Sequence, residues 1–507
     1  MATVLIDGQT LTIESAYSVS IGQSKLVLCD QAIDRMSQSR QVVEEIVNSN
    51  QVVYGINTGF GAMSSVKIDE TELAKLQTNL VRSHACGVGE RMDPEHVLLM
   101  MVYRANSLAK GVSGIRPEVV KLLIDMINLG IAPIIPRIGS LGASGDLAPL
   151  SHMALGLIGE GSCLVRGKSD WKEYPTSEVL IENNLKPVKL QAKEGLSLIN
   201  GTSQMCTYLS LTLLNLERLL LFADASAACS LEAIRGSHSP FDPRIHNSRP
   251  QRGQLISASR IAGFLHDSEV KLSHEDCDRV QDAYCFRCVP QVHGPVIDIA
   301  METRRLLEIE INSATDNPLV FYGENGSEII SGGNFHGQNL ALASDSIAVA
   351  CHELASIAER RINQVLDPNW GGQSAFLAID EGLESGYMIV QYVAAACIAE
   401  LHLLSNPVTT SNVPVSMGKE DHVSMGATGT FRSLKSTALL SQVIANELVC
   451  SIESLDRLEI QPGNGVVQLK NWVRKIVAPF AGDRVMSHEC QNLANSILSV
   501  DPHDIFG

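Results

Sequence analysis

The sequence predicts a mainly α-helical protein built as a bundle of long helices, and three observations support this prediction. Apolar residues recur at spacings of three and four over long stretches such as Leu340–Leu366. These stretches exceed the roughly 8–20 residues of ordinary globular helices. The composition is 45% hydrophobic but only 5% aromatic, and helices rich in small aliphatic residues can pack closely along their length.

The first expected element is a small β-hairpin at the N-terminus. Thr3–Ile13 holds two β-rich runs on either side of Asp7-Gly8, a dipeptide typical of tight hairpin turns. Pro117 then opens a helical pattern that stops at Gly130, as expected from the preference for proline at the start of a helix and glycine after its end. Longer helices are expected over Met205–Gly236, Leu340–Leu366 and Phe431–Leu458.

Length, charge and cysteine content restrict the class of protein. The 507 residues carry a net charge of −17, which disfavours nucleic acid as a partner, and the apolar content is too high for a disordered chain.

We expect an N-terminal region over residues 1–112 and a helical body over residues 113–507. Neither of the most apolar segments, Met205–Ala223 and Met388–Leu404, is expected to span a membrane. Scattered cysteines and the lack of a signal-peptide pattern predict a cytoplasmic protein.

A glycine-rich segment, Gly139–Leu147, carries the most specific chemical signal. It lacks the G-x-x-x-x-G-K-[ST] and G-x-G-x-x-G spacings of phosphate-binding loops, and Asp146 stands where a G-x-S-x-G motif needs glycine. In Ala143-Ser144-Gly145, however, the unhindered glycine nitrogen can attack the alanine carbonyl carbon when the turn is tight. Loss of two waters then closes a five-membered ring with an exocyclic methylene. The chain can thus make an electrophile from itself.

The stretch from Gly139 to His152, GSLGASGDLAPLSH, resembles the signature of the aromatic amino acid lyases and aminomutases, and the resemblance extends from Tyr54 to beyond Glu420. It implies the helical-bundle fold of the aspartase/fumarase-like superfamily. It also implies a 4-methylidene-imidazol-5-one group formed autocatalytically from residues Ala143, Ser144 and Gly145, with no external cofactor. A homotetramer with active sites shared between subunits is implied as well.

The resemblance assigns roles in two further segments. In Tyr54–Gly61, YGINTGFG, Tyr54 would be an acid/base residue on a lid-like loop that faces the electrophile. A phenol titrates at about pH 10, so this role requires surroundings that favour the phenolate. In Val280–Val292, Arg287 would bind the substrate carboxylate, which a planar guanidinium can hold with two hydrogen bonds. The same segment would supply Tyr284 as a catalytic residue and Gln281 as a substrate-binding residue.

Cys285-x-x-Cys288 in the same segment allows a redox or zinc interpretation. A second C-x-x-C at zinc-ribbon spacing and an H-E-x-x-H motif are both missing from the sequence. We therefore expect no metal site.

Four positions describe the expected substrate pocket. Asn200 matches the family's asparagine near the electrophile, and Phe335 matches an aromatic wall. Ser83-His84 occupies the position that sorts substrates in this family, and Ser-His is typical of histidine lyases, although tyrosine-specific members also carry histidine. Glu420 stands where phenylalanine and tyrosine lyases usually have glutamine. A carboxylate pairs well with imidazole and can act as a base, whereas beside a phenyl ring it would be buried without a partner.

The resemblance therefore implies elimination of ammonia from L-histidine to give trans-urocanate, the first step of histidine degradation. Three departures from the usual family pattern, at Lys419, Ser374-Ala375 and Glu384, leave room for a modified substrate. The alternatives are a tyrosine or phenylalanine lyase, a 2,3-aminomutase and, in a different class, a helical scaffold without activity. The intact Ala-Ser-Gly motif, Tyr54 and Arg287 argue against the scaffold.

Overall fold

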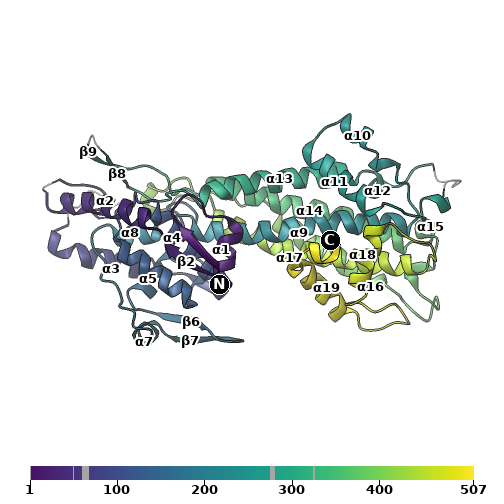
Figure 1. Ribbon diagram of the computed structural model, residues 1–507, viewed down its shortest axis with the longest axis horizontal. Helices are drawn as coiled ribbons and strands as arrows, with labels where there is room; N and C mark the ends of the chain where they lie inside the picture. Colours follow the sequence, from purple (N-terminus) through teal and green to yellow (C-terminus); the bar gives the residue numbers. More distant parts are fainter. Residues whose placement is uncertain (1, 50, 60–67, 275–279, 324–325, 507) are drawn as a thin grey trace. The chain divides into compact units, whose positions relative to one another are not determined.

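The computed structural model describes residues 2–49, 51–59, 68–274, 280–323 and 326–506. The chain forms two compact units (Figure 1). The first comprises Met1–Ser210, Arg304–Ser344 and Pro407–Phe431, and the second comprises Leu211–Thr303, Asp345–Asn406 and Arg432–Gly507. The predicted division after residue 112 stays a prediction.

The first unit contains short helices and small β-sheets. Its strands are β1 (Ala2–Ile6), β2 (Ser24–Leu28), β3 (Val88–Arg91), β4 (Ile131–Pro133), β5 (Pro136–Ile138), β6 (Ser162–Arg166), β7 (Trp171–Pro175), β8 (Leu319–Gly323) and β9 (Gly326–Ile330). Its helices are α1 (Ile13–Ser20), α2 (Asp30–Val47), η2 (Glu70–Glu72), α3 (Leu73–His84), α4 (Pro94–Ala109), α5 (Pro117–Asn128), α6 (Leu147–Leu157), α7 (Thr176–Glu182), α8 (Glu194–Ile199) and η6 (Ser416–Gly418). The described strands pair as β1-β2, β3-β5, β4-β6-β7 and β8-β9.

The described elements of the second unit are all helical. They are η3 (Ser239–Phe241), α10 (Pro243–Asn247), α11 (Arg252–Phe264), η4 (Leu272–His274), α12 (Tyr284–Arg287), α15 (Pro368–Gly371), η5 (Ala375–Leu377), α16 (Met388–Leu404), α18 (Asn464–Val473), α19 (Ser487–Ser499) and α20 (His503–Phe506). Four long helices have residues in both units: α9 (Ser203–Ala233), α13 (Val289–Glu310), α14 (Gln338–Leu366) and α17 (Gly426–Asp456).

The predicted helices are confirmed. α5 begins at Pro117, and α9 and α14 cover the predicted ranges within a few residues at each end. α17 begins at Gly426, five residues before the predicted start at Phe431. At this earlier start the backbone N–H of Gly426 donates to Ser424 Oγ at 3.1 Å, which satisfies one of the amide groups that the first turn of a helix leaves unpaired.

Three helical stretches are long and apolar enough to cross a membrane by length and composition alone. They are Glu194–Ala233, Gln338–Leu366 and Gly426–Asp456. The apolar windows of these stretches are 72%, 67% and 83% buried inside the protein, respectively. Their apolar side chains therefore serve largely as protein core.

The predicted N-terminal hairpin is wrong, because β1 pairs in parallel with β2 and α1 lies between them in the sequence. Asp7 does form a turn, since its Oδ1 accepts from the backbone N–H groups of Gln9 and Thr10 at 2.7 and 2.9 Å. Thr12 and Ser15 then cap α1 reciprocally, each side chain accepting from the other's backbone N–H at 3.2 and 3.1 Å. The chain therefore leaves the turn as a helix rather than as an antiparallel strand.

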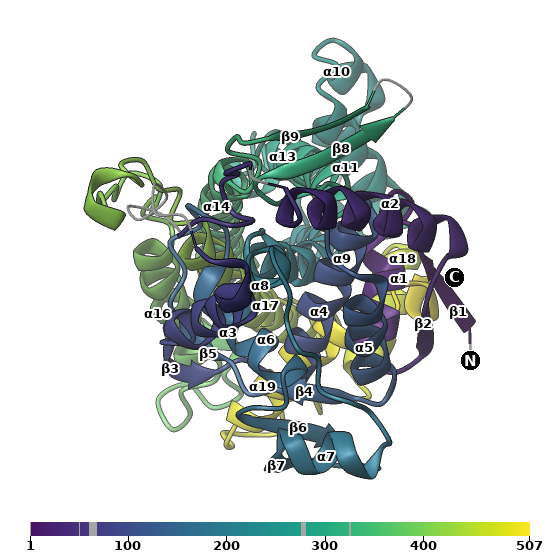
Figure 2. The ribbon, with the colours of Figure 1, turned by 90° about the vertical axis from the view of Figure 1, so that its left-hand side faces the viewer.

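Helix α4 forms the centre of the first unit. Its residues from Val97 to Ala109 are all buried, and it packs against α1, α2 and α5 (Figure 2). Arg104 within it donates to the carbonyl oxygens of Ser197 and Thr315 at 2.5 and 3.2 Å. Burial lowers the pKa of Arg104 to about 10. Arg104 thereby ties the core helix to α8 and to the segment before β8, both of which lead to the candidate site.

A buried ion pair organises part of the second unit. Arg361 on α14 donates to Glu447 on α17 through two nitrogens, at 2.5 and 2.9 Å, and both side chains are fully buried. Arg361 Nη1 also donates to the carbonyl oxygen of Cys285 at 3.5 Å. This contact anchors α12, which carries Tyr284 and Arg287.

Candidate active site

A cavity of about 600 Å³ in the first unit brings together six of the residues predicted to form the site. These are Tyr54, His84, Ser144, Asn200, Phe335 and Glu420. The rest of the described lining comes from α3, where it is mixed apolar and polar, from α6 and α8, where it is apolar, and from two other segments. It consists of Leu76, Asn79, Leu80, Ser83, Leu147, Leu196, Ile199, Asn317, Ser416 and Met417.

The Ala143-Ser144-Gly145 motif lies in a tight turn between β5 and α6. Gly142, which precedes the motif, and Gly145, its last residue, have φ values of +66° and +77°, which favour glycine. The carbonyl oxygen of Gly142 accepts from Ser424 Oγ at 2.8 Å and from the backbone N–H of Gly337 at 3.1 Å. These contacts hold the start of the turn in a compressed conformation.

The end of the turn is held by Asn200 and Gly201. Asn200 Nδ2 donates to the carbonyl oxygen of Ser144 at 2.6 Å, and the backbone N–H of Asp146 donates to the carbonyl oxygen of Gly201 at 2.7 Å. A Cβ on Gly145 would overlap the backbone of Gly201. Among the described residues, Asn200 Oδ1 is buried without a hydrogen-bond partner. The small residues, the tight turn and this spare acceptor all fit a ring formed from the three residues.

The side chain of Asp146 links the turn to the start of α9 through hydrogen bonds. Its Oδ2 accepts from the backbone N–H groups of Gln204 and Met205 at 2.8 and 3.1 Å, and its Oδ1 accepts from Ser140 Oγ at 2.9 Å. The carboxyl group therefore takes the place of a cap at the N-terminus of α9. Burial raises the pKa of Asp146 from 3.8 to about 7.

The raised pKa of Asp146 predicts a pH-dependent stability. Between pH 3.8 and about 7 the folded protein retains a proton that the unfolded chain has released. Asp146 therefore contributes stability at low pH that is lost as the pH rises through about 7, by at most about 1.4 kcal/mol per pH unit. Asp146→Asn has no such titration. We expect the melting temperature of the wild type minus that of the variant to fall from pH 4 to pH 7; a difference that stays constant or rises would contradict this.

His84 is the last residue of α3, and its hydrogen bonds define its tautomer. Nδ1 lies 2.9 Å from the carbonyl oxygen of Leu80 and 3.0 Å from Ser83 Oγ. A carbonyl oxygen only accepts, so a hydrogen bond to Leu80 requires the proton on Nδ1. In the neutral ring Nε2 is then an acceptor, which suits the N–H of another imidazole. His84 lines the cavity, and its role in binding the substrate stays a prediction.

Glu420 reaches the same cavity from the segment between α16 and α17. Its backbone pairs with that of Val415, with N–O distances of 2.9 and 3.3 Å. Between them Ser416 and Met417 have φ values of +53° and +54°, a conformation that costs a non-glycine residue about 1–2 kcal/mol. Local strain of this kind is concentrated at functional sites. Ser416 and Met417 line the cavity but belong to no motif that could have been recognised in the sequence.

Tyr54 lies in a turn that packs against the segment before β8. Gly55 has a φ of +76°, and a Cβ there would come within 2.7 Å of Pro318 Cδ. Next to that proline, Asn317 lines the cavity, with its Oδ1 accepting from the backbone N–H of Gly332 at 2.7 Å. Sequence reasoning missed Asn317, whose only signal was an Asn-Pro turn dipeptide. Residues 60 and 61 of the Tyr54–Gly61 segment lie outside the described residues.

Three predicted site residues belong to the second unit and are not among the described residues that line this cavity. They are Gln281, Tyr284 and Arg287. Tyr284 is 69% exposed, and the Arg287 guanidinium carbon lies 4.4 Å from the centre of its ring. Arg287 Nε donates to the carbonyl oxygen of Asp282 at 3.1 Å. α12 thus presents an aromatic ring and a cation side by side on an exposed turn.

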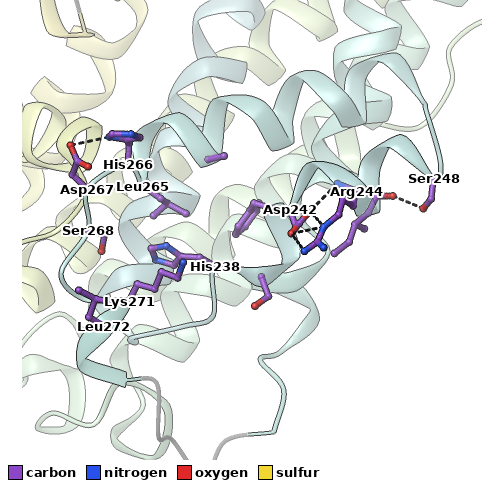
Figure 3. A pocket seen from close by; sticks show the side chains of 14 residues that line it. His238, Asp242, Arg244, Ser248, Leu265, His266, Asp267, Ser268, Lys271 and Leu272 are labelled. Atoms are coloured by element: carbon purple, nitrogen blue, oxygen red, sulfur yellow. Dashed lines mark hydrogen bonds and ion pairs between the residues drawn. The ribbon is translucent and has the colours of Figure 1, made fainter.

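A larger cavity, of about 1090 Å³, lies in the second unit (Figure 3). Two pairs of its polar side chains contact each other, Arg244 with Asp242 at 2.6 Å and His266 with Asp267 at 3.0 Å. Its described lining includes none of the residues predicted from sequence to form the site. The chemistry of the side chains, rather than the size of the cavity, therefore identifies the first-unit cavity as the candidate active site.

Known proteins resemble this chain over nearly its whole length. The family model described as aromatic amino acid lyase matches residues 11–475. Histidine ammonia-lyase from Deinococcus radiodurans is 44% identical over 98% of this chain and 94% of its own length, and that from Myxococcus xanthus is 42% identical over 98% and 97%. The crystal structure of histidine ammonia-lyase from Trypanosoma cruzi matches with a TM-score of 0.89 and 37% identity, covering 98% of this chain and 93% of its own. The chain therefore belongs to the aromatic amino acid lyase family.

Proposed function

We propose that the protein acts as a histidine ammonia-lyase, which eliminates ammonia from L-histidine and releases trans-urocanate in the first step of histidine degradation. The observation that carries the proposal is the cavity that joins Ser144 of the electrophile motif to His84 and Glu420. Identities of 42–44% to curated histidine ammonia-lyases support the choice of substrate over tyrosine or phenylalanine.

Ala143, Ser144 and Gly145 form the 4-methylidene-imidazol-5-one group in this proposal. The group supplies an electrophile that ordinary side chains lack, while the protein supplies binding and orientation. The positive φ of Gly145 and its contact with the Gly201 backbone support ring closure, since both bring successive peptide groups close together. Asn200 holds the carbonyl oxygen of Ser144 through its Nδ2, while its Oδ1 remains a spare acceptor near the reacting atoms.

The imidazole of the substrate binds between His84 and Glu420. Nε2 of His84 accepts a hydrogen bond from one ring N–H, and the carboxylate of Glu420 accepts from the other when the ring is protonated. Tyr54 or Glu420 takes the proton from the β-carbon. Phe335 and the apolar residues on α6 and α8 exclude water from the cavity.

The substrate carboxylate binds Arg287, with Gln281 and Tyr284 as hydrogen-bonding neighbours and Tyr284 as a further catalytic group. We place these residues in the active site of another subunit of a homotetramer. Their exposed turn supports this arrangement. So does α16, where only Val390, Ala394 and Leu401 are buried although the helix is strongly apolar. Ile389, Tyr392 and Leu403 on α16 are 54–61% exposed, and an apolar face of this kind suits a subunit interface.

A cytoplasmic location is part of the same proposal. The cysteines among the described residues are free thiols, and several of them are buried. Free thiols of this kind are stable in a reducing compartment.

Product analysis with L-histidine tests the proposed reaction. A lyase releases urocanate and ammonia in equal amounts, which absorbance and an ammonia assay measure independently. Accumulation of β-histidine would instead indicate a 2,3-aminomutase. A chain that retains its full calculated mass and forms no product would be an inactive scaffold.

A further inference from the structure

The carboxyl group of Glu310, the last residue of α13, lies close to the electrophile motif but has no part in the proposed mechanism. It is partly buried, and burial raises its pKa. Its Oε1 accepts a hydrogen bond from Thr202 Oγ1 at 2.6 Å. Thr202 directly follows Asn200 and Gly201, the two residues that hold the turn.

Thr202 stands at the N-cap of α9 but does not cap it with its side chain. The backbone N–H of Cys206 donates to the carbonyl oxygen of Thr202 at 2.9 Å, which marks Thr202 as the N-cap residue. A threonine in this place usually accepts from the N–H groups two and three residues further on. Here those N–H groups, of Gln204 and Met205, donate to Asp146. The Thr202 hydroxyl instead donates to Glu310.

Glu310 is connected to the turn because Asp146, rather than the Thr202 side chain, accepts from the first amides of α9. While Thr202 donates to Glu310, its hydroxyl is turned away from the α9 amides, and Asp146 keeps them. Without the carboxyl group, the hydroxyl can rotate to accept from the same amides and compete with Asp146. Asp146 follows Gly145 directly, and its own N–H donates to Gly201. A shift of Asp146 would therefore displace the residue that has to close the ring.

We propose that Glu310 is a positioning residue for the electrophile-forming turn, and that it acts through the hydroxyl of Thr202 and the Asp146 cap of α9. The inference rests on the proposed function, because the turn matters only if it forms the electrophile. Neither Glu310 nor Thr202 is among the described residues that line the candidate substrate cavity.

Two variants and a conservative control test the role of Glu310. Glu310→Ala removes the acceptor, Thr202→Val removes the donor with little change of shape, and Glu310→Gln keeps an oxygen acceptor. For Glu310→Ala we expect both kcat for histidine and the fraction of chains lighter by two waters in intact-mass spectra to fall about tenfold, as loss of a buried hydrogen bond implies. Thr202→Val has no hydroxyl that could compete with Asp146 for the α9 amides, so both quantities should stay close to those of the wild type. KM is expected to change less than kcat. Glu310→Gln should keep most of both quantities. Adding Thr202→Val to Glu310→Ala should restore both toward the wild-type values, because the competing hydroxyl is then absent.

Glu308→Ala is the matched control. Glu308 lies on the same helix and pairs with Arg304 at the surface, at 3.3 Å, so its loss should leave mass and kcat unchanged. A Glu310→Ala protein with a lower melting temperature but full water loss and unchanged kcat would overturn the proposal, as would a double variant that is no better than Glu310→Ala. If Glu310→Ala alone does not fold, the double variant decides, and a folded double variant that does not lose two waters would overturn the proposal. A wild-type chain that never loses two waters would overturn the proposed function instead, and the two failures are thereby distinguished.

Discussion

Replacing Ser144 with alanine is expected to abolish the electrophile and nearly all activity. The serine hydroxyl supplies the second of the two waters that leave during ring formation, and alanine has no leaving group at that atom. The variant should therefore lack the mass loss of two waters. Enzymes typically accelerate reactions by about 10⁶-fold or more, and we expect the turnover of histidine to fall by at least about 10³-fold.

The structure predicts that Ser144→Ala still folds. Ser144 is held by its backbone carbonyl oxygen, which accepts a hydrogen bond from Asn200 Nδ2. The substitution leaves this backbone group in place. The melting temperature should thus stay close to that of the wild type. Ser37→Ala, at an exposed position on α2, is the control and should keep both mass loss and activity. A Ser144→Ala protein that still loses two waters would show that another serine forms the ring.

Replacing Glu420 with glutamine is expected to lower kcat/KM for histidine by about 100-fold or more, the range in which a general acid or base acts. Glutamine keeps the shape and the backbone pairing with Val415 but loses the charge. It can neither take a proton nor attract a protonated imidazole. Steady-state kinetics with histidine measure the loss.

Asp421→Asn is the matched control for Glu420→Gln, because it removes the same charge from the neighbouring residue, which is not part of the described cavity lining. We expect its kcat/KM to stay within about twofold of the wild type, since exposed charges at such a distance are screened. Unchanged turnover in Glu420→Gln would remove Glu420 from the mechanism. An equal loss in both variants would point to the net charge of the loop instead.

The long helices could be predicted from the sequence because their apolar spacing repeats over many turns. The N-terminal hairpin could not be excluded in the same way. The Asp7-Gly8 turn is real, but the element that follows it depends on the reciprocal cap between Thr12 and Ser15, which uses serine where the usual motif has glutamate or glutamine. The pairing of β1 with β2 is a contact between segments about 20 residues apart, and local pattern does not encode it.

The reacting part of the site could be predicted because a continuous motif carries it. Ser144, His84 and Glu420 come from separate segments, yet the structure places them around one cavity. Asn317 and Met417 were missed, since each is brought to the cavity by backbone geometry rather than by a recognisable motif. The support of the turn by Asp146, Thr202 and Glu310 likewise depends on tertiary contacts, because Glu310 is 108 residues away from Thr202 in the sequence.

The central claim is that the cavity selects an imidazole side chain. The most direct test compares kcat/KM for L-histidine, L-tyrosine and L-phenylalanine with the same purified protein, by following urocanate, coumarate and cinnamate. We expect histidine to be preferred by at least about 100-fold, because an aromatic ring without ring nitrogens leaves the hydrogen-bonding groups of His84 and Glu420 unpaired. Clear formation of coumarate or cinnamate without urocanate would contradict the account.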